Sequence, residues 1–196
     1  MRRSLRAVST LVAATVLALS AAMTAGASST PLSAQALSIN QLPSGWFAAS
    51  DAGNTGAGCL ANLLEPAGVT QTQVAEVYFV HSGDIPFLDE KLATYSNAKK
   101  AFTKIASTIA ACHHPSGPYK GYQVTGTVTG WNFPKQGNAS IAYHMVFTTT
   151  THLTVDYDYV IARKKSVIVA VLEGNYPAVS SSQFSGFETM AMAKVS

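Results

Sequence analysis

Alternating apolar and polar positions in the second half of the chain predict a series of β-strands joined by short turns. The clearest strand is His152–Ala162, where apolar or aromatic residues take every second position and Asp156 and Asp158 lie on the other face. That second face is expected to be at least partly wet, since successive side chains of a strand point to opposite sides. Runs rich in β-branched and aromatic residues predict further strands over Val74–His81, Tyr122–Trp131, Ala139–Thr149 and Ser166–Leu172.

Two segments show the periodicity of an amphipathic helix, with apolar residues three or four positions apart. One begins near Ser96, as N-cap, and extends to about Cys112, and the other covers Ser180–Val195. Strands that follow one another so closely are joined by hairpins, which makes the sheet antiparallel. The pattern therefore predicts an α+β fold, a twisted antiparallel sheet of about five strands with helices packed mainly on one face.

The N-terminus has the three-part organisation of a secretory signal peptide. The basic segment Met1–Arg6 precedes the apolar stretch Leu11–Met23, and Ala25–Ala27 forms an A-x-A cleavage site. The apolar stretch is shorter than the roughly 20 residues that a membrane-spanning helix needs. We therefore expect a signal peptide over residues 1–27, a flexible N-terminal arm over 28–37 and a single secreted domain over 38–196.

Charge narrows the choice of partners. The 13 Lys and Arg residues include Arg2, Arg3 and Arg6 of the expected signal peptide, which leaves ten basic residues against ten Asp and Glu. A neutral chain lacks the surplus of basic groups that nucleic acid or an anionic membrane surface requires. We expect no nucleic-acid partner and no membrane span.

Cys59 and Cys112 are the two cysteines of the chain. In an oxidising compartment, two cysteines favour a disulfide bond. The alternative is a reactive thiol with His113 or His114 as its base, but an exported catalytic cysteine has little reason to keep one possible partner beside it.

Two groups of residues suggest chemistry. His113 and His114 beside Cys112 resemble a fragment of a zinc site, but adjacent ligands diverge and the other histidines have no ligand spacing, so neither a metal nor a cofactor is expected. Asp156 and Asp158 lie about 6.5–7 Å apart along one strand face, a separation that suits the acid and base of a glycoside hydrolase. Exposed carboxylates on an outer strand are the commoner explanation, and no nucleophilic serine motif is present. We therefore predict no enzyme.

Four aromatic residues are the candidate ligand-binding residues, because such rings can stack on a sugar or line an apolar cleft. Aromatic residues at strand ends also form the edge of a core, and this alternative stays open. The four are Trp131, Tyr119, Tyr122 and Phe133.

The order of short motifs resembles a known family. The motifs are Leu42-Pro43-x-Gly45-Trp46, Cys59, Ala111-Cys112, Phe133-Pro134-x-x-Gly137-Asn138-x-Ser140, Arg163-Lys164 and Ala193-Lys194-Val195. Between Ser38 and Val195 the chain resembles the actinobacterial extracellular sensor-like domains typified by the outer domain of the receptor kinase PknH. It also resembles the related secreted mycobacterial proteins of the LpqN and LppH kind.

The resemblance implies a secreted α+β domain with a twisted antiparallel sheet and a cleft for a small ligand, without catalysis. The chain departs from that family by having one possible disulfide where the kinase domain has two, and by lacking the acylated cysteine of the lipoproteins. No binding residue is carried over.

These observations predict a secreted, non-enzymatic binding or sensor-like domain of a bacterial cell envelope that takes a small apolar or glycan-like ligand or an envelope component. The alternatives are a protein-interaction module that uses an exposed sheet edge, and a secreted cell-wall hydrolase that uses Asp156 and Asp158.

Overall fold

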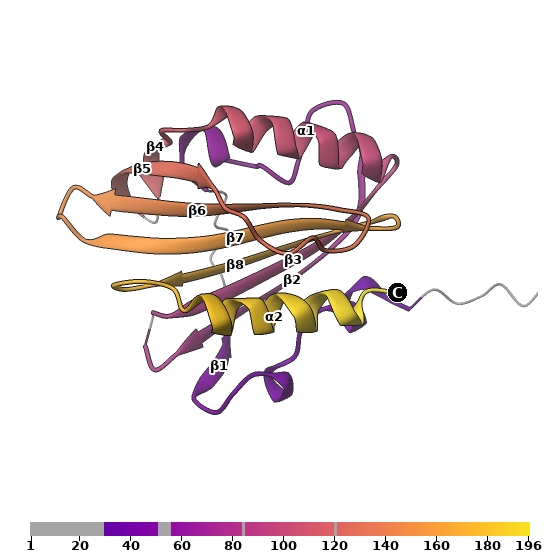
Figure 1. The fold of residues 1–196 in the computed structure, drawn as a ribbon, viewed down its shortest axis with the longest axis horizontal. Coiled ribbons are helices and arrows are strands. Elements are labelled where there is room, and N and C mark those ends of the chain that lie inside the picture. Colours follow the sequence, from indigo (N-terminus) through magenta and orange to yellow (C-terminus); the bar gives the residue numbers. More distant parts are fainter. Residues whose placement is uncertain (1–29, 51–55, 84, 120) are drawn as a thin grey trace, which may run out of the picture.

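The computed structural model describes residues 30–50, 56–83, 85–119 and 121–196. The expected signal peptide lies outside these residues. Eight strands form one sheet in the order β1-β2-β3-β8-β7-β6-β5-β4, and every neighbouring pair is antiparallel (Figure 1). The strands are β1 (Trp46–Ala49), β2 (Gln71–His81), β3 (Phe87–Tyr95), β4 (Ser116–Tyr119), β5 (Tyr122–Gly130), β6 (Ala139–Thr149), β7 (Thr154–Lys164) and β8 (Val167–Asn175).

Within the described residues, two α-helices flank the sheet, one on each side in Figure 1. Helix α1 follows β3, and its first turn is capped by the Asn97 side chain, which accepts a hydrogen bond from the backbone N–H of Lys100 at 2.9 Å. Helix α2 follows β8. The helices are α1 (Ala98–Ala111), α2 (Ser181–Lys194) and the 3-10 turns η1 (Leu32–Gln35), η2 (Ile39–Gln41) and η3 (Gly58–Leu60).

The predicted architecture was wrong in the number of strands and in the placement of the helices. The sheet has eight strands and not about five, and the helices cover opposite faces. Strand β3 was missed because three consecutive charged residues, Asp89, Glu90 and Lys91, resemble a solvated loop. Strands β1 and β4 have four residues each, too few for a visible period.

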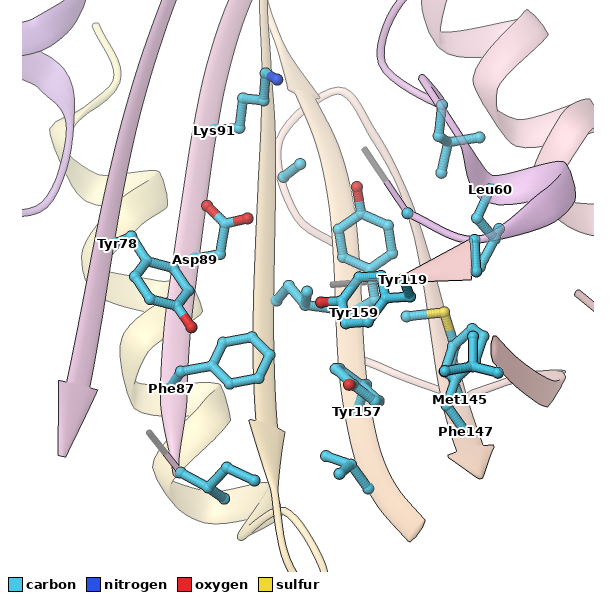
Figure 2. Close-up of a pocket in the computed structure, with 18 of the residues that line it drawn as sticks. Leu60, Tyr78, Phe87, Asp89, Lys91, Tyr119, Met145, Phe147, Tyr157 and Tyr159 are labelled. Carbon is cyan, nitrogen blue, oxygen red and sulfur yellow. The ribbon is translucent and has the colours of Figure 1, made fainter. Parts of the chain in front are cut away.

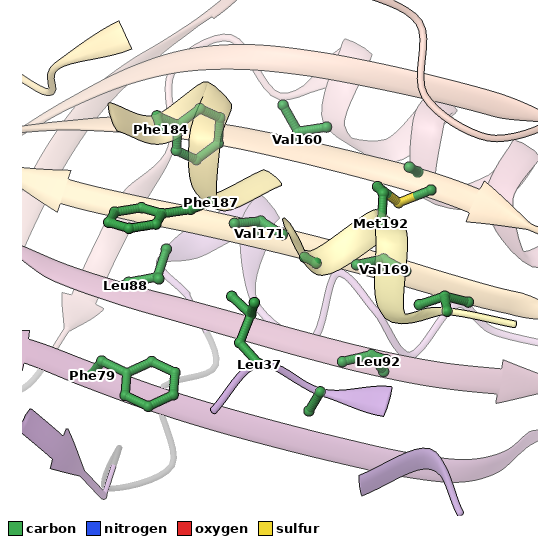
Figure 3. Packing of buried hydrophobic residues seen from close by; sticks show 14 of the residues in the cluster. Leu37, Phe79, Leu88, Leu92, Val160, Val169, Val171, Phe184, Phe187 and Met192 are labelled. Atoms are coloured by element: carbon green, nitrogen blue, oxygen red, sulfur yellow. The ribbon is translucent and has the colours of Figure 1, made fainter. Parts of the chain in front are cut away.

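The face under α2 carries the larger part of an apolar core (Figure 3). Phe184 and Phe187 of α2 pack on strand residues that include Leu88, Val160, Val169 and Val171. The part of the expected N-terminal arm that the structure describes is folded, since Leu32, Ala36 and Leu37 are buried in the same core. Apolar burial thus holds residues 32–37 on the domain.

The face under α1 is only partly filled. Ile105 and Ile109 of α1 belong to a second buried cluster with Ile161 and Ile168 of the sheet. The predicted disulfide Cys59–Cys112 is confirmed: it joins η3 to the end of α1, with the two Cα atoms 5.8 Å apart.

Candidate ligand cavity

A cavity of about 830 Å³ lies on the face of the sheet that carries α1. Its floor is made by β2, β3, β8, β7 and β6, and residues 56–57, 60 and 62–65 around η3 form part of its wall (Figure 2). Pockets of this volume enclose a small molecule. The cavity is therefore the candidate functional site.

Strand register brings the floor residues together. Tyr78, Asp89, Leu172 and Tyr159 are successive cross-strand partners on β2, β3, β8 and β7. The neighbouring row consists of Val80, Phe87, Gly174, Tyr157 and Met145. Because side chains alternate across a strand, both rows face the cavity while the residues between them face α2.

Glycine at position 174 makes room for two aromatic rings. A Cβ atom there would lie 2.5 Å from the ring of Phe87 and 3.0 Å from that of Tyr157. Both distances are shorter than a normal carbon contact, so a larger residue would push these rings into the cavity.

Four of the rings form a continuous aromatic wall. The centroid of Phe87 lies 5.4 Å from that of Tyr78 and 5.7 Å from that of Tyr157, and Tyr157 lies 5.5 Å from Phe147. Such spacings are typical of favourable tilted and edge-to-face pairs. The wall offers a ligand both apolar faces and phenolic hydroxyl groups.

The other end of the cavity carries the charged groups. Glu76 and Lys91 form an ion pair at 3.5 Å across β2 and β3. Burial, and next the negative charge of Asp89, raise the pKa of Tyr159, and Glu76 adds to this effect. The Tyr159 hydroxyl therefore stays protonated. The negative charges of Asp89 and Glu76 both act on it.

The structure separates the four predicted binding residues. Tyr119 and Tyr122 line the cavity. Trp131 and Phe133 lie on the opposite face, where their ring centroids are 5.9 and 6.0 Å from that of Phe184 in α2, and line a second hollow of about 440 Å³. The four predicted residues thus lie on two different faces of the sheet.

Sequence reasoning missed the other aromatic and charged residues of the cavity. The alternation in His152–Ala162 did place Tyr157 and Tyr159 on one strand face. It did not show that this face borders a cavity, since period-two alternation does not say what covers a face. Phe87 and Asp89 lie in β3, the strand that was not predicted.

Asp156 and Asp158 lie on the α2 face, away from the cavity. Asp158 is 4% exposed, and its Oδ1 lies 2.9 Å from Nδ1 of His144. Its cross-strand partner on β8 is Glu173, another buried carboxyl. The two aspartates therefore do not line the aromatic cavity, and Asp158 belongs to a buried polar row.

His113 and His114 are exposed just beyond α1. Among the residues that the structure describes, there is no group of three or more His, Cys, Asp or Glu side chains that could hold a metal ion. Within the same residues, no helix combines the length and the apolar character required to cross a membrane.

Comparison with the models of protein families and with curated proteins gave no match. Among solved structures, the chain is similar to the extracellular domain of PknH from Mycobacterium tuberculosis, with a TM-score of 0.52 and 14% sequence identity. The similarity covers 65% of this chain and 66% of that chain, slightly less than two thirds of it. It supports the predicted relationship to PknH at the level of the fold, and does not extend to proteins of the LpqN and LppH kind. Over this part of its length, the chain therefore has a fold similar to that of the PknH extracellular domain.

Proposed function

We propose that this protein is an extracellular, non-enzymatic binding domain of a bacterial envelope, sensor-like in kind, that holds a small ligand with an apolar body. The observation that carries the proposal is the cavity of about 830 Å³ with its wall of four aromatic rings. Large concave sites with a few convergent polar groups are the usual places where proteins hold small molecules.

The polar groups of the cavity suit binding. Burial raises the pKa of both Tyr157 and Tyr159, so their hydroxyls remain neutral at physiological pH. Neutral phenols donate and accept hydrogen bonds and are poor nucleophiles. They would orient a ligand without reacting with it.

An extracellular location is supported by three observations. The disulfide Cys59–Cys112 is of a kind that persists in oxidising compartments. The N-terminal sequence has the pattern of a secretory signal peptide. The similar solved structure is itself an extracellular domain.

Native mass spectrometry of the protein secreted from an actinobacterial host tests the proposal. The decisive variant is Leu172→Trp, because Leu172 lies in the cavity floor between Asp89 and Tyr159 and a larger ring there fills the space. The matched control is Val74→Trp at a site that is 52% exposed. We expect extra mass that leaves on denaturation in the natural protein and in the control, but not in Leu172→Trp. A bare chain in all three, or mass retained by a folded Leu172→Trp, would contradict the proposal.

A further inference from the structure

The charges that line the cavity are unbalanced. The described lining residues include three with a carboxylate side chain and one with an amine, and they include no arginine or histidine. The amine is already engaged, since Lys91 pairs with Glu76 at 3.5 Å. The lining residues with charge are Glu65, Glu76, Asp89 and Lys91.

The aromatic wall meets the carboxylates at Asp89. Tyr78 is the direct cross-strand partner of Asp89, and Phe87 lies two residues before Asp89 on the same face of β3. Figure 2 shows the Asp89 carboxylate beside the Tyr78 ring, with Phe87 next along the strand. The faces of aromatic rings carry negative electrostatic potential, so rings and carboxylate act in the same direction on an ion placed there.

An anionic ligand would meet repulsion at this end of the cavity. A carboxylate or phosphate head would lose its water and lie near like charges in surroundings of low dielectric constant. A cation would be attracted by the carboxylates and by the ring faces, which is how aromatic sites recognise ammonium groups.

We propose that the ligand of this cavity is a cationic amphiphile, with an ammonium-type head at the Asp89 end and an apolar body along the aromatic wall. This inference rests on the proposed function and narrows it to one chemical class. The apolar body is held by Tyr157, Phe147 and Met145, and the head by Asp89 with Tyr78 and Phe87.

Isothermal titration calorimetry at low salt with three probes of equal chain length tests the inference. The probes are decyltrimethylammonium, decanoate and decyl maltoside, each below its micelle concentration. We expect the ammonium probe to bind at least tenfold more tightly than decanoate and more tightly than the maltoside. The Leu172→Trp variant should lose this binding, and Val74→Trp should keep it.

Two substitutions of opposite effect identify the source of the preference. Asp89→Asn should weaken the binding of the ammonium probe about tenfold and leave the binding of the maltoside nearly unchanged. Lys91→Met should strengthen the binding of the ammonium probe several-fold. Asp156→Asn, the same change on the opposite face of the sheet, is the matched control and should alter neither. Circular dichroism verifies that each variant is folded. If Asp89→Asn does not fold, the result for Lys91→Met decides whether charge causes the preference.

Different failures are distinguishable. If decanoate or the maltoside binds as tightly as the ammonium probe and Leu172→Trp abolishes that binding, the cavity binds ligands but the inference of a cationic head is overturned. It is equally overturned if none of the probes binds, or if neither Asp89→Asn nor Lys91→Met changes the preference. Ammonium binding that survives in a folded Leu172→Trp would contradict both the inference and the proposed site.

Discussion

Among the described residues, three glutamates are buried on the side of the sheet that carries α2, two of them in strands and Glu188 in α2 itself. Burial raises the pKa of Glu173 to about 8, with the charge of Asp158 as a second cause. Burial also raises the pKa of Glu90 and of Glu188 to about 7, although the Leu37 N–H, which donates to Glu90 at 2.5 Å, acts in the opposite direction. Among the residues that the structure describes, neither carboxyl oxygen of Glu173 or Glu188 has a hydrogen-bond partner, so both groups are more stable in the core when protonated.

The raised pKa values of these groups predict that folding stability depends on pH. Below the ordinary pKa of 4.5 they are protonated in both the folded and the unfolded state. As the pH rises, the unfolded state loses these protons first, which favours unfolding until the folded groups also ionise. We expect the free energy of unfolding to fall between about pH 5 and about pH 8, as measured by chemical denaturation across this range.

Glu173→Gln isolates the largest contribution. In this variant the free energy of unfolding should fall less steeply with rising pH. The variant should be more stable than the natural protein by roughly 2–4 kcal/mol at pH 8, with little change at pH 4.5. Glu65→Gln, at an exposed position, is the control and should keep the pH profile. An unchanged profile in Glu173→Gln would show that the buried carboxyl does not cause the dependence.

At the scale of elements, the disulfide lies beside the wall of the cavity. Cys59 lies in η3, which with its flanking residues contributes Ala57, Leu60 and Leu63 to the cavity lining. Its partner, Cys112, ends α1, so the bridge holds this wall against the helix. The loop that it closes spans 53 residues.

The double variant Cys59→Ser/Cys112→Ser should lower the free energy of unfolding by about 2–4 kcal/mol, because the open chain gains conformational entropy when it unfolds. It should also weaken the binding of the ammonium probe, because the bridge no longer holds the cavity wall around Leu60 against α1. Denaturation and calorimetry on the same samples measure both effects. Loss of stability with unchanged affinity would mean that the bridge serves the fold alone.

At the scale of the molecule, the two faces of the sheet are packed differently. The α2 face is covered mainly by packed apolar side chains that include Phe184, which is 0% exposed. The α1 face is filled by a helix over one part and left open as a cavity over another. We infer that stability and binding can be changed separately.

Phe184→Ala should cost about 3–5 kcal/mol of stability, since it removes a fully buried ring that contacts Trp131 and Phe133. In the fraction that remains folded, the preference for the ammonium probe over decanoate should be unchanged. Leu172→Trp should do the reverse, losing binding at a smaller cost in stability. Thermal denaturation and calorimetry compare the two, and a changed preference in Phe184→Ala would show that the faces are coupled.

Local pattern predicted the helices and most of the long strands within a few residues. The segment from Ser96 to Cys112 contains α1, and Ala139–Thr149 matches β6. Strand β3 did not follow from pattern, because Glu90 is buried between Asp89 and Lys91 in a run that resembles a surface loop. Its place between β2 and β8 comes from hydrogen bonding to two partners.

The sequence by itself determined the elements with strong periodicity, the pairing of Cys59 with Cys112 and the separation of Tyr157 and Tyr159 from Asp156 and Asp158 along β7. These depend on spacing within one segment or on there being one possible partner. Only the tertiary structure decided which helix covers which face, and that Tyr119 and Tyr122 border a cavity while Trp131 and Phe133 support α2. The physical reason is that a strand's alternation sorts residues between two faces, whereas packing across distant strands decides which face is filled and which stays open.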